Sequence, residues 1–210
     1  MFWDSRIDSE FKKIWRVIDK LCCWQKNICT KIDECLGILR QSGDNYSFLN
    51  QKGKWVALDP SLVVAYGAFH DEQTQTAPIS TDTKILMRNT DLSQGIYITD
   101  DTDINFTYSG IYNIQFSAQL ERQAGGGGGK KTVAIWLNKN GNNIPWTNTF
   151  VGFVSNGVEH VAAWNWFVDV VPGDIIQLIW WQDDDIHMIA LPPNSFPETP
   201  SVIVTVSKVG

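Results

Sequence analysis

The chain of 210 residues is 43% apolar and 19% charged, with ten Trp and a net charge of −6 at neutral pH. This composition can supply a sizeable hydrophobic core and excludes an intrinsically disordered chain. The first 42 residues hold 8 Lys/Arg against 6 Asp/Glu, whereas the rest hold 9 against 17. Because the larger part is acidic, a nucleic-acid partner is not expected.

Residues 1–42 are predicted to form an anchor followed by a coiled-coil α-helix. From Ile7 to Leu39 apolar residues recur at alternating spacings of three and four, which is typical of a seam between helices. No second helix is predicted in the same chain, so we expect the seam to pair with other copies. Isoleucine occupies both core positions of the heptad, which favours trimers over dimers. The predicted trimerisation residues are Phe11, Ile14, Ile18, Leu21, Gln25, Ile28, Ile32, Cys35 and Leu39.

The same segment allows three pairs of alternative interpretations. The helix could instead fold back on the rest of its own chain as an amphipathic helix. Met1, Phe2 and Trp3 precede the seam and form a candidate particle anchor, because contiguous exposed apolar residues mark docking surfaces; a disordered start is the alternative. All four cysteines lie in this segment, so they cannot cross-link the remaining domain, and a reducing compartment fits best. Inter-chain disulfides and buried thiols are both compatible with them.

Targeting to a membrane or for secretion is not expected. The N-terminal residues lack the apolar stretch of a secretory signal, and no segment reaches the ~18 apolar residues of a membrane span. We therefore expect synthesis and assembly in the cytoplasm, with no membrane partner.

Residues 43–62 are predicted to be a polar connector with one short strand at 54–58, and residues 63–210 a β domain. Short apolar runs are separated there by Gly, Pro, Asn and Asp turn signals, as in a ten-stranded jelly-roll sandwich. The candidate strands are 64–69, 84–88, 96–99, 104–107, 112–120, 132–138, 145–154, 158–170, 175–181, 186–190 and 202–208.

Two of these segments, 158–170 and 175–181, are apolar on both faces. A monomeric sandwich buries one face of each sheet, so we expect a neighbouring subunit to cover the other, around a threefold axis lined by Trp and Ile. The competing interpretation is a sugar-stacking surface, which is open for one or two of Trp136, Trp146 and Trp181.

No pattern in the sequence indicates catalysis, a metal or a cofactor. The glycines at 125–129 precede Lys130-Lys131-Thr132, but a strand follows where a phosphate loop needs a helix, so we interpret them as a hairpin tip. Acidic clusters at 100–103 and 183–185 lack the spacing of a known calcium loop. The three histidines are too scattered for a zinc site.

Several motifs in the β domain are shared with a known family. They are the segment 66–71 (YGAFHD) with 74–76 (TQT), the Gly-x-Tyr-x-x-x-Phe pattern at 110–116, the turn Pro172-Gly173-Asp174 and the closing strand 201–206. Through them, residues 64–210 resemble the trimeric jelly-roll heads of the complement first component and the tumour necrosis factors. The amino-acid sequence of the chain also resembles those of fibre and knob proteins of tailed bacteriophages, particularly phages that infect cyanobacteria.

The phage resemblance implies a non-enzymatic virion structural protein. It would be a homotrimeric fibre that decorates the capsid, attached by its N-terminal part to a capsid or tail protein, with the knob outward and host-surface glycan as a candidate contact. The alternative is a tail-fibre receptor-binding protein that recognises host polysaccharide. A depolymerase would need paired carboxylates in a cleft, and no such pair is indicated.

Overall fold

The structure is a computed structural model. It describes residues 13–14, 16–18, 20, 47–49, 55–57, 63–123, 129–194 and 197–210. The chain divides into two compact units, Met1–Leu58 and Asp59–Gly210, which are considered separately below. Among the described residues, no helix has the length and apolarity needed to cross a bilayer.

The described part of the first unit contains helical residues and one strand pair. The helical residues are Lys13, Ile14, Arg16, Val17, Ile18 and Lys20. Strand β1 (Ser47–Leu49) pairs antiparallel with β2 (Trp55–Ala57). Strand β2 confirms the one predicted at 54–58, and β1 was not predicted. The boundaries proposed at residues 42 and 62 stay predictions.

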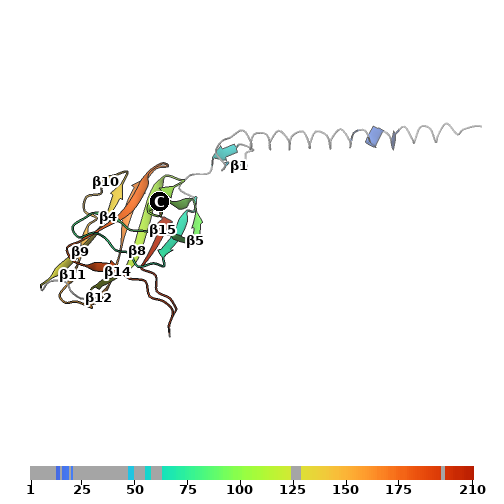
Figure 1. Ribbon diagram of the computed structural model, residues 1–210. Coiled ribbons are helices and arrows are strands. Elements are labelled where there is room, and N and C mark those ends of the chain that lie inside the picture. Colours follow the sequence, from blue (N-terminus) through green and yellow to red (C-terminus); the bar gives the residue numbers. More distant parts are fainter. Residues whose placement is uncertain are drawn as a thin grey trace, which may run out of the picture. The chain divides into compact units, whose positions relative to one another are not determined.

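The second unit is a sandwich of two antiparallel sheets, which confirms the predicted jelly roll (Figure 1). The six-stranded sheet has the order β12-β8-β15-β3-β5, with β14 also paired to β8. The seven-stranded sheet has the order β10-β9-β13-β7-β6, with β11 also paired to β9 and β4 to β13. The strands are β3 (Tyr66–Asp71), β4 (Thr83–Lys84), β5 (Asn89–Gln94), β6 (Ile96–Thr99), β7 (Asp103–Phe106), β8 (Gly110–Arg122), β9 (Lys131–Lys139), β10 (Asn142–Asn143), β11 (Thr149–Phe153), β12 (Glu159–Val170), β13 (Ile175–Gln182), β14 (Ile186–Met188) and β15 (Val202–Lys208).

The core lies between the two sheets and follows from the alternation of apolar residues along each strand. In β8, Tyr112 and Ile114 are completely buried, and in β13 so are Leu178 and Trp180. Phe116 contributes an aromatic cluster, since its ring stacks on Trp166 at a centroid distance of 5.2 Å and meets Trp164 edge-on at 4.5 Å. Each buried aromatic side chain removes roughly 150 to 250 Å² of surface from water, which makes this cluster a major source of stability.

The structure differs from the predicted strands at several places: the segment predicted at 84–88 is a strand only at Thr83–Lys84, and β10 was not predicted. The segment predicted at 145–154 becomes a strand only at Thr149, because Pro145 has no backbone N–H and Trp146 adopts a φ of 67°. Strand β5 was not predicted, since its sequence NTDLSQ lacks apolar alternation. It pairs only with β3 at the end of the six-stranded sheet, where polar residues are common.

The turn between β12 and β13 contains a carboxylate whose ionisation should make stability depend on pH. Asp174 accepts hydrogen bonds from Lys139 Nζ at 2.8 Å, the Val171 backbone N–H at 2.8 Å and Asn140 Nδ2 at 2.7 Å. These bonds favour the charged form and lower the pKa of Asp174 to about 2. A group with a depressed pKa stabilises the fold above its unfolded pKa of 3.8, and the stabilisation is lost as the pH falls toward 2.

The substitution Asp174→Asn tests this contribution. We expect it to lower the free energy of unfolding by about 2 kcal/mol at pH 6, because one pKa unit corresponds to about 1.4 kcal/mol. The difference between the two proteins should shrink between pH 5 and pH 2, where the native carboxyl becomes protonated. Urea denaturation at a series of pH values measures it. A difference that stays constant over this range would show that ionisation of Asp174 is not the cause.

Candidate functional site

The first candidate surface is the outward face of the six-stranded sheet, on the side away from the core. Strand registers place its outward residues in three rows that cross β12, β8, β15, β3 and β5. None of these residues is Lys, Arg, Asp or Glu. The rows are Ala163, Ser117, Ile203, His70 and Asn89; Asn165, Gln115, Thr205, Ala68 and Leu92; and Phe167, Asn113, Ser207, Tyr66 and Gln94.

This uncharged face also exposes large apolar side chains. Phe167 is 64% exposed, and Val161 next to the rows is 60% exposed. On β12 the charged residues Glu159 and Asp169 stand at or next to the strand ends, and Asp91 on β5 lies beside His70, at the opposite edge of the sheet from Phe167 and Val161. Depletion of charge around exposed aromatic and aliphatic residues is typical of the centre of a protein–protein interface. The chemistry of this face is therefore that of a docking surface for a protein.

One of the two apolar faces predicted for 158–170 is exposed at Val161 and Phe167, but the tryptophans of this strand lie on the other face. Trp166 and Trp180 lie inside the sandwich of one chain. On β13, the outward Ile179 and Trp181 pack with Ala134 and Trp136 in a small cluster of the same chain. Trp166 and Trp180 are covered within one chain and Trp181 is partly covered, so these three give little reason for a second copy.

Two of the nine predicted trimerisation residues can be located. Ile14 and Ile18 are helical, are 54% and 41% exposed, and lie one helical turn apart on one face. The other predicted residues lie outside the described residues: Phe11, Leu21, Gln25, Ile28, Ile32, Cys35, Leu39 and the anchor residues Met1, Phe2 and Trp3.

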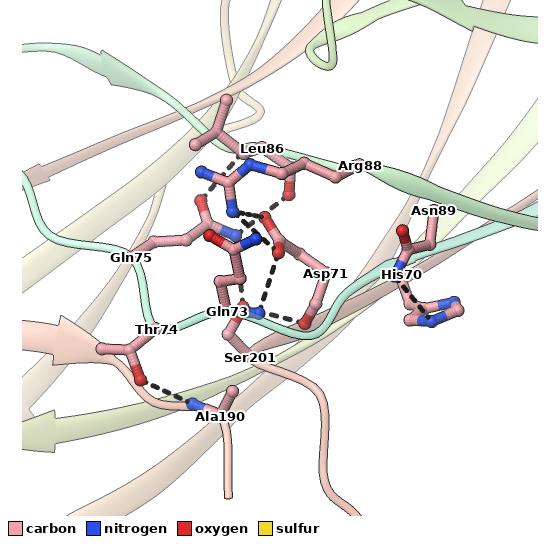
Figure 2. A network of polar contacts seen from close by, with 10 residues as sticks. All are labelled: His70, Asp71, Gln73, Thr74, Gln75, Leu86, Arg88, Asn89, Ala190 and Ser201. Carbon is pink, nitrogen blue, oxygen red and sulfur yellow. Dashed lines mark hydrogen bonds and ion pairs between the residues drawn. The ribbon is translucent and has the colours of Figure 1, made fainter.

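A buried polar network at the end of β3 has no counterpart among the predicted sites (Figure 2). Asp71 is completely buried and accepts two hydrogen bonds of 2.9 Å from Arg88 Nη1. Gln75 Nε2 donates to the Leu86 carbonyl at 3.0 Å and to Ser201 Oγ at 3.3 Å. The network joins β3, the segment before β5 and the start of β15. Its buried polar groups have partners, so we assign it a structural role.

The residue next to this network points the opposite way, because side chains alternate along β3. His70 lies on the uncharged face, with Nδ1 3.1 Å from Asp91 and Nε2 3.3 Å from Glu72. It borders a groove of about 690 Å³ that also includes Ile203 and Glu198. In the part of the chain that the structure describes, no three metal-ligating side chains gather closely enough to hold an ion.

The two acidic clusters singled out in the sequence have structural partners. Asp103 accepts hydrogen bonds from Thr102, Gln177 and Lys84, which outweigh the effect of burial and lower its pKa. In the second cluster, burial by itself would raise the pKa of Asp184, but the hydrogen bond from Arg122 Nε at 2.7 Å lowers it. Both carboxylates are therefore charged and engaged within the fold.

The last candidate is a groove of about 340 Å³ beside the seven-stranded sheet. It is lined by Asp82, Trp136, Asn143, Ile144, Pro145, Trp146 and Asn148. Of the three tryptophans considered for sugar stacking, Trp136 is buried and Trp181 packs in the small cluster described above. Only Trp146 is fully exposed.

No family model matches this sequence, and no curated protein matches it. Among solved structures, the chain is similar to the Eiger tumour necrosis factor of S. frugiperda, with 9% identity, a TM-score of 0.52 and coverage of 70% of this chain and 92% of that one. Murine APRIL at pH 5.0 gives 9% identity and a TM-score of 0.49 over 70% and 100% of the two chains. The globular domain of zebrafish complement 1qA gives 9% and 0.44 over 70% and 98%. At this identity, the likeness to Eiger shows the fold alone.

Proposed function

We propose that this chain is a non-enzymatic, homotrimeric virion structural protein: a fibre that decorates a phage capsid, attached through its N-terminal part, with the β domain projecting. The observation that carries the proposal is the uncharged face of the six-stranded sheet, with Phe167 and Val161 exposed. A second copy of the chain is the occupant we assign to this face. The exposed pair Ile14 and Ile18 supports the same conclusion from the helical segment.

Three subunits follow from the side chains of the predicted seam, where Ile occupies both core positions. The tumour necrosis factor type of fold in the β domain is compatible with that number. A role without catalysis is supported by the buried charged pairs Asp71–Arg88 and Arg122–Asp184, since both join segments of the fold. The virion location rests on the sequence resemblance to phage fibre proteins.

Light scattering of the full chain tests the assembly. A trimer would have three times the 23.7 kDa mass of one chain. A monomer over the micromolar range would contradict the proposal, because it would leave both apolar surfaces exposed. Electron cryomicroscopy of the particle that carries the protein tests the location: we expect residues 1–8 to contact the capsid and residues 63–210 to face outward.

A tail-fibre receptor-binding protein is the second candidate, and the exposed Trp146 favours it. Both candidates share the trimeric knob and a contact with host-surface glycan. They differ in the site of attachment, so density for residues 1–8 on the tail instead of the head would decide for the second.

A further inference from the structure

Trp146 combines two features that do not help the chain to fold. It is the most exposed large apolar side chain among the described residues, and its φ of 67° lies in the left-handed region that L residues rarely adopt. Backbone strain of this kind persists where the surrounding structure enforces it, and it concentrates at functional sites.

The turn around Trp146 is held firmly by the neighbouring strands. Thr147 Oγ1 donates to the Ile144 carbonyl at 2.8 Å and accepts from the Leu137 N–H at 3.1 Å. The Thr147 carbonyl accepts from Trp166 Nε1 at 2.9 Å. The exposed indole of Trp146 is therefore presented from a fixed backbone. A backbone that is already fixed adds little to the conformational entropy lost when a ligand binds.

The groove beside this indole offers several polar groups. Asp82, Asn143 and Asn148 contribute to its lining. Trp136 Nε1 donates to Asn143 Oδ1 at 2.8 Å, and Asn138 Nδ2 donates to the same oxygen at 3.2 Å. Asn138 Oδ1 is buried without a hydrogen-bond partner in the described part of the chain. The groove is thus lined by a residue with a strained backbone, Trp146, and by Asn143, which contacts a buried amide with one unsatisfied acceptor.

We propose that this groove binds a neutral saccharide, with Trp146 stacked against the apolar face of one sugar ring. The amides of Asn143 and Asn148 and the carboxylate of Asp82 would exchange hydrogen bonds with its hydroxyls. A groove of about 340 Å³ lies at the lower end of the roughly 300 to 1,000 Å³ typical of small-molecule sites. The inference rests on the glycan contact in the proposed function and assigns its place.

Charge favours a neutral sugar over an acidic one. Residues 140–158 contain no Lys, Arg, Asp or Glu. Among the described residues that line the groove, Asp82 is the only formally charged one, and its carboxylate would repel a uronate or a sulfated sugar. The groove belongs to the seven-stranded sheet, whereas the uncharged face assigned to trimerisation belongs to the other sheet.

The test uses the full-length protein in a glycan array, followed by calorimetric titration. The titrated probes are cellopentaose, mannopentaose, chitopentaose and a galactose pentamer, with pentagalacturonate as the acidic comparison. We expect at least one neutral oligosaccharide to bind and pentagalacturonate not to bind. Trp146→Ala should weaken binding on the order of tenfold or more, as expected for loss of a central aromatic contact. Phe150→Ala is the matched control, because Phe150 is 67% exposed and does not line the groove. This variant should bind the oligosaccharide with the affinity of the native protein.

A second variant separates binding from folding. Trp146→Gly relieves the positive φ, so we expect it to abolish binding while raising the midpoint of thermal unfolding by roughly 2 °C. If no saccharide binds the native protein, or if pentagalacturonate binds best, the inference is wrong. If a neutral sugar binds equally well to native protein and Trp146→Ala, this site is wrong while the proposed glycan contact stands. Light scattering of the same samples judges the proposed trimer independently.

Discussion

Truncation of Asp184 to alanine should lower the free energy of unfolding of the β domain by about 3 to 5 kcal/mol, because it leaves a buried guanidinium without its carboxylate. The side chain of Arg122 is 1% exposed, and its Nε lies 2.7 Å from Asp184 Oδ2. The pair joins β8 to the loop between β13 and β14, two segments far apart in the chain. At roughly 2 to 4 °C per kcal/mol, the unfolding midpoint should fall by about 10 °C.

The double substitution Arg122→Met/Asp184→Leu is the control for this prediction. It removes both charges and keeps most of the buried volume, so it should recover most of the stability that Asp184→Ala loses. Thermal and urea denaturation of the native protein, Arg122→Met, Asp184→Leu and the double variant give the coupling energy. A coupling energy near zero would show that the two charges do not stabilise the fold as a pair.

The sandwich could be predicted from the sequence because most of its long strands have a recognisable residue pattern within their own segment. Short runs rich in apolar residues identified β8, β12, β13 and β15, and turn residues separated them. The ends were less certain: β8 extends to Arg122, a charged residue that the prediction left outside the strand. Its burial depends on Asp184, which lies 62 positions away. Local pattern cannot reveal such a pair, since each residue taken alone is typical of a surface.

The candidate sites likewise combine features that have a local sequence pattern with features that depend on residues far apart in the chain. The second apolar face of β12 was visible in the sequence, but the uncharged rows require the registers of β8, β15, β3 and β5. The buried Asp71 network likewise brings together Arg88 and Ser201 from distant segments. Trp146 was one of three candidate tryptophans; the structure distinguishes it through its exposure and its φ, neither of which has a sequence signal.

The double substitution Phe167→Asp/Val161→Asp should prevent the β domains of neighbouring subunits from associating. Both side chains are exposed in one chain, so the substitutions create no cavity and should leave the fold of the monomer intact. In the proposed trimer each site would bury an unpaired carboxylate, at a cost of several kcal/mol. We expect association to weaken on the order of 100-fold or more. Val154→Asp, at an exposed apolar residue outside both strands of the β12–β8 pair, is the matched control and should leave the mass unchanged.

Comparison with the helical segment shows which surface controls assembly. Ile18→Asp/Ile32→Asp places charges in the predicted seam and should prevent the helices from associating. If light scattering finds monomers only when all four substitutions are combined, the β domain and the helix can each maintain the trimer independently. The main contribution of the helix would then be length and attachment. If Phe167→Asp/Val161→Asp leaves the mass and the unfolding midpoint unchanged even in the seam-disrupted chain, the uncharged face is not a subunit interface.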